Sequence, residues 1–269
     1  YQGLVDDQYT LTLVSGDGAI EDLVGNDLDG EATAVGTVPS GDGTAGGDFV
    51  VNLSVDLTGP IAVTSSVLKG DVLSSADLTY TVQFDEELDA TNLDAADVVL
   101  TGLVSGAQTA TGFNYDPPTS TLTVDYQGLL DDQYTLTLVS GDGSIEDLVG
   151  NDLDGEAAVV GTVPSGDGNA GGDFVVNFSV DLTGPIAVTS SVLEGDVLSS
   201  AGLTYTVQFD EELDATNLDA ADVVLTGLVS GAQTATGFNY DALTSTLTVD
   251  YQGLVDDQYT LTLVSGDGA

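Results

Sequence analysis

The sequence predicts an all-β protein, in which tandem β-sandwich domains of about seven strands each form an extended rod. Three observations predict this class. Apolar and polar residues alternate in short segments, clusters of Gly, Asp, Asn and Pro separate these segments, and the chain repeats itself over a long period. A hydrophobic content of 42% is enough for a core, so the chain is expected to fold despite a net charge of −44.

The repeat has a period of 125 residues, because the tetrapeptide that begins at Tyr1 recurs at Tyr126 and Tyr251. The first two copies differ at ten of 125 positions, which makes them 92% identical. A solenoid turn takes only ~20–50 residues, so each repeat is predicted to be a domain of its own. The sequence starts and stops within a repeat, which predicts a segment of a longer array.

Strand positions follow from the alternation of apolar and polar residues. Strict alternation predicts strands over 78–84, 134–138 and 174–180. Weaker patterns predict strands over 61–67, 98–101, 109–115 and 120–124. The one candidate for a helical turn is 89–97, and the long segment 141–172 is expected to hold a further short strand around 157–163. About seven strands per period fit an immunoglobulin-like (Ig-like) sandwich of roughly 100 residues with an inserted loop.

The start of a repeat is predicted at Asp56 and again at Asp181, where Asp-Leu-Thr-Gly-Pro precedes a strand. Residues 1–55 are then the C-terminal part (strands F and G) of one repeat, 56–180 a complete repeat, and 181–269 the N-terminal part (strands A to F) of the next. Pro restricts its own φ and the residue before it, so this short linker is expected to be stiff and the domains to form a rod.

Tyr134 follows the predicted turn between strands E and F. It occupies the position of a tyrosine corner, in which the hydroxyl binds back to the chain at that turn. Asn52-Leu53-Ser54 and Asn177-Phe178-Ser179 match the pattern for N-glycosylation. Both lie within a predicted strand, which favours a coincidental match.

The order of four motifs resembles the bacterial Ig-like domains of the S-layer SbsA type. These motifs are Asp-x-Thr-Gly-Pro at 56–60, the strand and acidic loop at 78–89, Asp-Asp-Gln-Tyr-Thr-Leu-Thr-Leu at 131–138, and Asp-Leu-Val-Gly-Asn-Asp-Leu at 147–153. The resemblance implies an Ig-like sandwich, an extracellular setting and a structural or adhesive role, and it brings no catalytic residues. The strand at 174–180 and the Gly-rich stretch before it are less typical of that pattern.

Of the 45 acidic residues, 36 are Asp, and most of these fall in predicted loops. The linker, the B–C loop and the F–G loop share one end of an Ig-like sandwich, so their carboxylates are expected to converge there. The turn with Asp6 and Asp7 in the preceding repeat is expected to face the same junction. Calcium, which takes about six to eight oxygen ligands, is the predicted cofactor. The predicted ligands are Asp56, Asp85, Glu86, Glu87, Asp89, Asp142, Asp147, Asn151, Asp152, Asp154, Asp181, Asp210, Glu211 and Glu212.

A second interpretation of the acidic residues stays open. Asp caps turns, and a high charge keeps a repetitive β protein soluble or adapts it to high salt. Asp147 and Asn151 are equally suited to loop-closing hydrogen bonds. Residues 151–155 only half resemble the start of an EF-hand, because the Glu at the required distance is missing.

Composition excludes several classes of function. Without Cys or His there are no disulfides, thiolate or imidazole metal sites, or His-dependent catalytic triads. One Lys and no Arg exclude a nucleic-acid face, and Lys69 is Glu194 in the next copy, so no mechanism that needs a cation is general to the repeat. A hydrolase cleft with aromatic platforms is not expected without Trp, and no apolar run approaches the ~18–20 residues of a membrane span.

The predicted function is therefore a structural one, without enzymatic activity. The chain is expected to be a repeat segment of a long extracellular or cell-surface protein, such as a filament, surface layer or adhesin stalk, stiffened by calcium at the domain junctions. The alternative is a carbohydrate- or partner-binding Ig-like module of a secreted multidomain protein. Expected partners are neighbouring copies of the repeat, in the same or adjacent chains, and a surface glycan.

Overall fold

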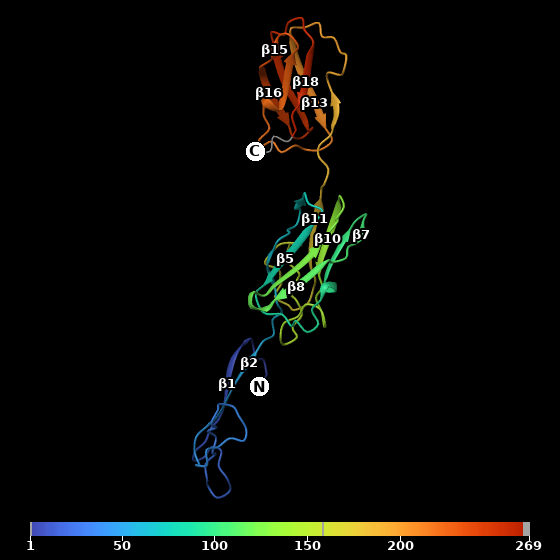
Figure 1. Ribbon diagram of the computed structural model, residues 1–269. Coiled ribbons are helices and arrows are strands. Elements are labelled where there is room, and N and C mark those ends of the chain that lie inside the picture. Colours follow the sequence, from blue (N-terminus) through green and yellow to red (C-terminus); the bar gives the residue numbers. More distant parts are fainter. Residues whose placement is uncertain (1, 158, 266–269) are drawn as a thin grey trace. The chain divides into compact units, whose positions relative to one another are not determined.

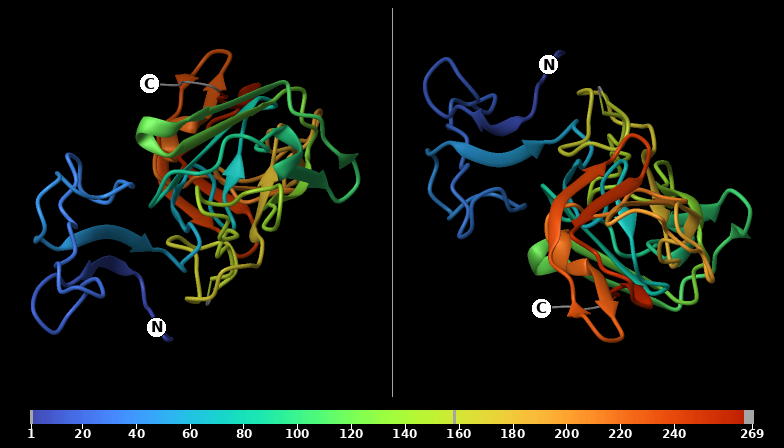
Figure 2. Two further views of the ribbon diagram at one scale, coloured as in Figure 1. Left: turned by 90° about the horizontal axis from the view of Figure 1, so that it is seen from below. Right: turned by 90° about the horizontal axis from the view of Figure 1, so that it is seen from above.

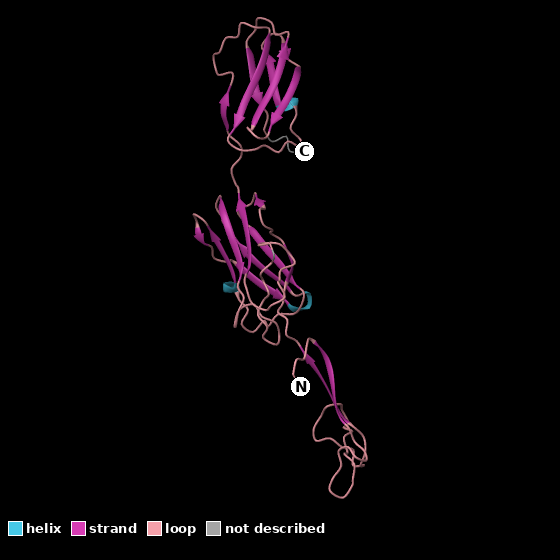
Figure 3. Ribbon diagram, turned by 180° about the vertical axis from the view of Figure 1, so that it is seen from behind, coloured by secondary structure: helices cyan, strands magenta, loops and turns pink. Residues whose placement is uncertain are grey.

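The computed structural model describes residues 2–157 and 159–265 (Figure 1). Contacts divide the chain into two compact units, Tyr1–Leu182 and Thr183–Ala269. Strands and loops dominate both units, and the helical segments described are the short 3-10 turns Ala95–Asp97, Pro117–Thr119 and Ala220–Asp222 (Figure 3). Among the described residues, none lies in a helix that is long and apolar enough to cross a membrane.

The first unit contains a complete sandwich of two sheets. One sheet has the order β3-β5-β9-β8, with the bounds Ala62–Ser65, Leu78–Phe84, Thr121–Tyr126 and Gly112–Asp116. The other has the order β4-β11-β10-β6-β7, with the bounds Val72–Leu73, Phe174–Val180, Asp132–Leu138, Val98–Gly102 and Gly106–Ala107. In an Ig-like sandwich, β3, β5, β9 and β8 take the places of strands A, B, E and D, and β11, β10 and β6 those of G, F and C. The predicted all-β, Ig-like fold is therefore confirmed.

Alternation decides which face of each strand is buried. In β5, Leu78, Tyr80, Val82 and Phe84 are buried, while the residues between them are exposed or half-buried. The strand β11 alternates in the same way. A register shift of one residue would turn the whole apolar set to solvent, so the pattern specifies the pairing strongly.

The core of this sandwich lies between the two sheets. Leu122, Leu136 and Val176 are fully buried there. Tyr126 of β9 spans the sandwich, because its hydroxyl donates a hydrogen bond to the carbonyl oxygen of Val98 in β6 at 2.7 Å. The bond satisfies a buried hydroxyl and ties one sheet to the other.

The predicted tyrosine corner is confirmed at Tyr134. Its hydroxyl donates to the carbonyl oxygen of Leu130 at 3.1 Å and accepts from the backbone N–H of Leu130 at 3.0 Å. The ring stacks on Phe178 of β11 with 5.6 Å between ring centroids. The corner therefore ties the turn before β10 to the pair of strands that follows.

The long segment between β10 and β11 is held by the first residues of the sandwich. The backbone N–H of Asp154 donates to the carbonyl oxygen of Pro60 at 3.0 Å. The Ser165 hydroxyl accepts from the N–H of Ala62 at 2.9 Å and donates to the Asp154 carbonyl oxygen at 2.8 Å. The prediction of a strand around 157–163 is wrong for the described residues of that range, which form turns, bends and irregular loop (Figure 2). Residue 158 lies outside the described residues. Hydrogen bonds to residues 60–62 take the place of a strand partner for this segment.

The first unit also contains a hairpin of β1 (Asp7–Leu13) and β2 (Phe49–Val55). Its antiparallel register runs from Asp7 opposite Val55 to Leu13 opposite Phe49. β10 and β11 pair in the equivalent register one period later. The hairpin therefore has the structure of an F–G strand pair.

The second unit has one sheet of order β12-β13-β17-β16 and another of order β15-β14-β18. The bounds are Ala187–Ser190, Gly202–Phe209, Thr246–Gln252 and Ala235–Asp241 for the first, and Gly231–Ala232, Val223–Gly227 and Tyr259–Leu263 for the second. The Tyr251 hydroxyl donates to the carbonyl oxygen of Val223, as Tyr126 does in the first unit. The inter-sheet link therefore recurs with the repeat.

The strand predictions succeeded where alternation was strict. The strands β5 and β11 have the predicted bounds, and β10 begins two residues earlier than predicted. The helical turn predicted within 89–97 is a 3-10 turn capped by Asp94. β4 and β7 were not predicted, because a strand of two residues is too short to show alternation.

Candidate metal centre

Three carboxylates meet at one end of the complete sandwich. Asp56 comes from the linker, Glu86 from the B–C loop after β5, and Asp147 from the F–G loop between β10 and β11. One carboxylate oxygen of each residue lies within 4.8 Å of the others. We call this group the junction cluster. The predicted convergence of these three segments is thus present in the geometry.

Asp147 is buried, and the loop around it keeps its carboxylate in place. Its Oδ1 accepts hydrogen bonds from the backbone N–H groups of Val149 and Asn151, both at 2.8 Å. Its Oδ2 accepts from the side chain of Asn151 at 2.7 Å. Asp147 therefore makes the loop-closing hydrogen bonds that the second interpretation of the acidic residues expected, and it is also a member of the junction cluster.

Backbone contacts hold the three segments together. Leu88 and Asp147 form a β-bridge between the B–C and F–G loops. The side-chain amide of Asn151 reaches the carbonyl oxygen of Asp56 at 3.4 Å. The linker passes so close that a Cβ on Gly59 would lie 1.8 Å from the Asp152 carbonyl oxygen, so only glycine fits there. The cluster is therefore built on a tight approach of backbone segments.

Glu86 is the member whose ionisation is most disturbed. Partial burial, followed by the charges of Asp147, Asp56, Asp85 and Asp6, raises its pKa to about 7. Desolvation and like charges both favour the neutral acid. Among the described residues, none donates a hydrogen bond to the Glu86 carboxylate, so its oxygens are available to a ligand.

Asp6, from the turn before β1, also reaches this junction. Its Oδ1 accepts a hydrogen bond from the backbone N–H of Leu57 in the linker at 2.7 Å. Asp7 instead accepts from the N–H of its neighbour Gln8. Of the two acids expected there, Asp6 is the one that contacts the linker.

A second group, the F–G cluster, consists of Asp142, Glu146 and Asp152, with ligand atoms within 4.8 Å of one another. Glu146 and Asp152 are joined by a β-bridge. Asp152 Oδ1 is buried and has no hydrogen-bond partner within the described part of the chain. A buried carboxylate oxygen without a partner is costly, and a bound cation or water removes that cost.

The first repeat carries the same cluster at Asp17, Glu21 and Asp27. Asp27 Oδ1 is likewise buried without a partner among the residues described. A further group, Asp29, Glu31 and Asp42, lies in the same segment. The sequence prediction named none of these six residues, although subtracting the period of 125 from Asp142, Glu146 and Asp152 gives Asp17, Glu21 and Asp27.

Other predicted ligands are used as backbone acceptors. Asp85 Oδ1 accepts from the N–H of Ile61 at 2.8 Å, and Asp89 Oδ1 accepts from the N–H of Thr91 at 2.8 Å. The buried Asp154 accepts from the N–H groups of residues 167 and 168. Glu87 is exposed. These four residues are not members of either cluster.

The predicted ligands of the next junction belong to different units. Asp181 follows β11 in the first unit, whereas Asp210, Glu211 and Glu212 follow β13 in the second. Asp210 Oδ1 accepts from the N–H of Ile186 at 2.7 Å, which repeats the role of Asp85. A metal site at this junction stays a prediction.

The chain cannot neutralise its own clusters. Lys69 is its one cationic side chain, against 45 acidic residues. Carboxylate oxygens are hard ligands that suit Ca²⁺ or Mg²⁺ and not the softer thiolate-seeking metals. The donor set of both clusters therefore fits calcium.

The fold defines an Ig-like β-sandwich protein with carboxylate clusters at the loops of one sandwich end. No protein-family model matches the sequence, and a search of curated proteins found no match. Among solved structures, the N-terminal part of the bacterial S-layer protein SbsC matches with a TM-score of 0.29 and 13% sequence identity. The match covers 74% of this chain and 40% of that structure, so the chain spans less than half of it. Membership of the SbsA-type family stays a prediction.

Proposed function

We propose that this chain is a structural repeat segment of a long extracellular or cell-surface protein, and that calcium bound by its carboxylate clusters stiffens it. The junction cluster is the observation that carries this proposal. A cation held by Asp56, Glu86 and Asp147 ties the linker to two loops of the sandwich that follows. Near-identity of the repeats supports a structural role, because binding modules usually diversify in their loops and here the loops are nearly invariant from copy to copy.

Calcium is proposed because of the ligand chemistry. A calcium ion takes about six to eight oxygen ligands, including carboxylates, backbone carbonyls and water. The junction cluster supplies three carboxylates, and the Asp56 carbonyl oxygen lies beside Asn151. The F–G cluster supplies three more, and one of its members, Asp152, has a buried Oδ1 without a partner among the described residues. Calcium in the F–G cluster would stabilise a repeat internally, and calcium in the junction cluster would restrain the linker.

Thermal unfolding of the full chain tests the calcium proposal. A ligand that binds only the folded state stabilises it by mass action, so calcium is expected to raise the unfolding midpoint over that measured with chelator at fixed ionic strength. A sodium control separates coordination from charge screening, and a magnesium control separates calcium from divalent cations in general. An equal midpoint in calcium, magnesium, sodium and chelator would refute the proposal.

Matched variants assign the effect to the junction cluster. Glu86→Gln removes a cluster carboxylate, whereas Glu87→Gln removes the exposed neighbouring charge outside both clusters. We expect the calcium-dependent shift to decrease in Glu86→Gln and to persist in Glu87→Gln. Asp142→Asn tests the F–G cluster in the same way, because Asp142 is an exposed member of it. Equal loss in Glu86→Gln and Glu87→Gln would point to the general charge instead.

The rod-like assembly is tested separately. We propose that successive repeats keep a constant spacing, since the short linker is restrained by Pro and by the junction contacts. Electron microscopy of the native assembly in calcium measures the axial repeat. A broad spread of angles between neighbouring domains in calcium would mean that the linker is a hinge and the array a flexible tether.

A further inference from the structure

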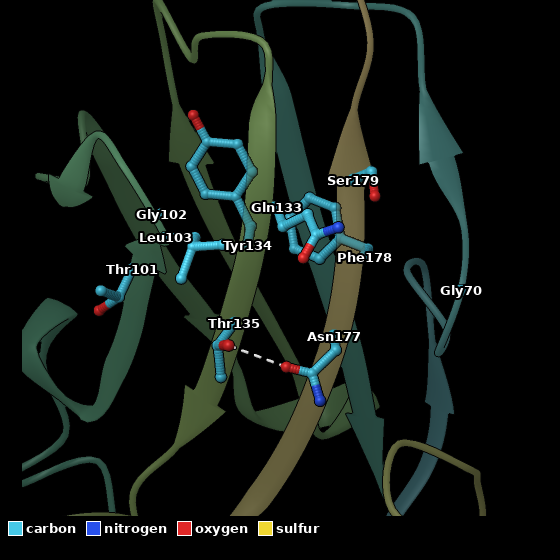
Figure 4. A pocket seen from close by; sticks show the side chains of 10 residues that line it. All are labelled: Gly70, Thr101, Gly102, Leu103, Gln133, Tyr134, Thr135, Asn177, Phe178 and Ser179. Atoms are coloured by element: carbon cyan, nitrogen blue, oxygen red, sulfur yellow. Dashed lines mark hydrogen bonds between the residues drawn. The ribbon is translucent and has the colours of Figure 1, made fainter. Parts of the chain in front are cut away.

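The outer face of the β4-β11-β10-β6-β7 sheet carries a shallow groove of about 490 Å³ (Figure 4). Thr101, Thr135 and Asn177 lie in one row across β6, β10 and β11, since Thr135 is opposite both of the others. Gln133 and Ser179 form the adjacent row. Their strand neighbours point into the core, so these side chains face outward.

This groove differs chemically from the rest of the surface. None of the ten residues that line it is acidic, although the chain has 45 acidic residues. Its side chains offer hydroxyl groups on Thr101, Thr135 and Ser179 and amides on Gln133 and Asn177. Such a surface suits a neutral, hydroxyl-rich group such as a sugar, and it lacks the charge that would hold a cation.

Asn177 presents a free amide nitrogen at this groove. The Thr135 hydroxyl donates to Asn177 Oδ1 at 2.8 Å, and this bond orients the side chain (Figure 4). Among the described residues, none accepts a hydrogen bond from Asn177 Nδ2, and the residue is exposed. Asn52 is exposed in the same way, with Thr10 donating to its Oδ1 at 2.9 Å.

Both residues begin an Asn-x-Ser sequence, and the seven other Asn residues of the chain do not begin Asn-x-Ser or Asn-x-Thr. Phe178 is buried and stacks on Tyr134, so alternation places Asn177 and Ser179 together on the outer face. The strand position had favoured a coincidental match in the sequence. The structure answers that objection in part, because on this strand Asn177 is exposed and Ser179 is half-buried on the same outer face.

We propose that Asn177 and Asn52 are N-glycosylated, and that the first sugar on Asn177 lies along the uncharged groove. The reaction is catalysed by a glycosyltransferase of the producing cell. Its co-substrate is a glycosyl donor whose anomeric carbon is bonded to an oxygen of a phosphate or diphosphate carrier. Asn Nδ2 bonds to the anomeric carbon as the bond from that carbon to the carrier oxygen breaks. The carrier leaves with the electron pair of that bond, and the amide proton passes to a base of the transferase.

Mass spectrometry of the full chain, isolated from cells that produce it, tests this modification. Because Lys69 is the one Lys or Arg, a protease that cleaves after Asp replaces trypsin. Cleavage after Asp173 and Asp181 releases Asn177 in a peptide, and cleavage after Asp48 and Asp56 releases Asn52. Both peptides are expected to carry the mass of a glycan.

Variants at Ser179 separate the motif from exposure alone. Ser179→Thr keeps the acceptor pattern and is expected to keep the glycan on Asn177, whereas Ser179→Ala is expected to lose it. Asn114 is a matched control, because it is exposed on a strand but followed by Tyr-Asp, and its peptide should be unmodified. Unmodified Asn177 and Asn52 peptides in the native protein would overturn the proposal, and so would a glycan retained on Asn177 in Ser179→Ala. These results do not depend on calcium binding.

Discussion

Asp6 accepts a hydrogen bond from the backbone N–H of Leu57, with 2.7 Å between Asp6 Oδ1 and Leu57 N. One period later, Asp131 Oδ2 accepts from the N–H of Leu182 at 3.1 Å. The turn before strand F of one repeat therefore holds the first residues of the linker to the next. This contact restrains the linker independently of any metal.

Asp6→Ala is expected to release the amide of Leu57. Loss of one hydrogen bond costs roughly 0.5–1.5 kcal/mol, so hydrogen exchange of that amide should be faster by a factor of about two to ten. Amide exchange followed by NMR measures this. Asp7→Ala is the matched control, because Asp7 accepts from the N–H of Gln8 and leaves the Leu57 contact intact. Equal exchange rates at Leu57 in all three proteins would show that the Asp6 contact does not restrain the linker.

Glu86 should make the calcium-free protein less stable as the pH rises. Partial burial, then the charges of Asp147, Asp56, Asp85 and Asp6, raise its folded-state pKa from 4.5 to about 7. Between pH 4.5 and about 7 the folded protein therefore binds more protons than the unfolded chain. The contribution of Glu86 to the free energy of unfolding is fully present below pH 4.5 and is lost as the pH rises through about 7.

Denaturant unfolding in chelator, at several pH values across that window, measures the Glu86 effect. Glu86→Gln should be less sensitive to pH than the parent protein, and Glu87→Gln should behave like the parent. Calcium should reduce the loss of stability toward high pH, because it binds the ionised carboxylates. A parallel pH dependence in parent and Glu86→Gln would exclude Glu86 as the source.

Tyr134→Phe should weaken the first unit without emptying its core. The substitution removes the hydroxyl that binds both backbone groups of Leu130 but keeps the ring that stacks on Phe178. We expect a loss of about 1–2 kcal/mol in the free energy of unfolding. Tyr134→Ala should cost roughly 3–5 kcal/mol, because it also leaves a cavity. Chemical unfolding compares the two, and an unchanged free energy of unfolding in Tyr134→Phe would mean that the hydroxyl contributes nothing.

Asp132 should protect the β6–β7 hairpin down to low pH. Hydrogen bonds from the backbone and hydroxyl of Ser105 and from the backbone N–H of Val104 outweigh desolvation and lower the pKa of Asp132 to about 2. A lowered folded-state pKa stabilises the fold above the ordinary value of 3.8, and this contribution is lost as the pH falls through about 2. NMR titration of the carboxylate measures the pKa.

Asp257 is an internal replicate of Asp132, because it accepts the equivalent bonds from Val229 and Ser230 and its pKa is also lowered to about 2. Asp132→Ala should loosen the hairpin of the first unit and leave that of the second unchanged. Ordinary pKa values for both carboxylates would contradict the hydrogen-bonding account.

Much of the fold could be predicted from local patterns. The strand 78–84 was found by alternation alone, and the tyrosine corner at Tyr134 by its place after a turn. The course of the F–G loop could not be predicted in this way. Its hydrogen bonds run to Pro60 and Ala62, which are distant in sequence and carry no pattern that marks them as partners.

The candidate site was predicted in outline and not in detail. Convergence of the linker with the B–C and F–G loops follows from strand order, and it brought Asp56, Glu86 and Asp147 together as expected. Strand order could not separate Glu86, which lies in the junction cluster, from the exposed Glu87 beside it. The difference depends on which side chain of the loop turns inward.

The sequence by itself determined the β class, the period and the phase of inward and outward residues, because these depend on spacing along the chain. Only the tertiary structure decided which carboxylates are acceptors for backbone N–H groups and which face one another. Asp85 and Asp147 both bind backbone N–H groups, yet only Asp147 also lies in the junction cluster. A hydrogen bond or a metal ligand requires atoms within a few ångströms, and for residues from three separate loops that distance is set by how the loops pack.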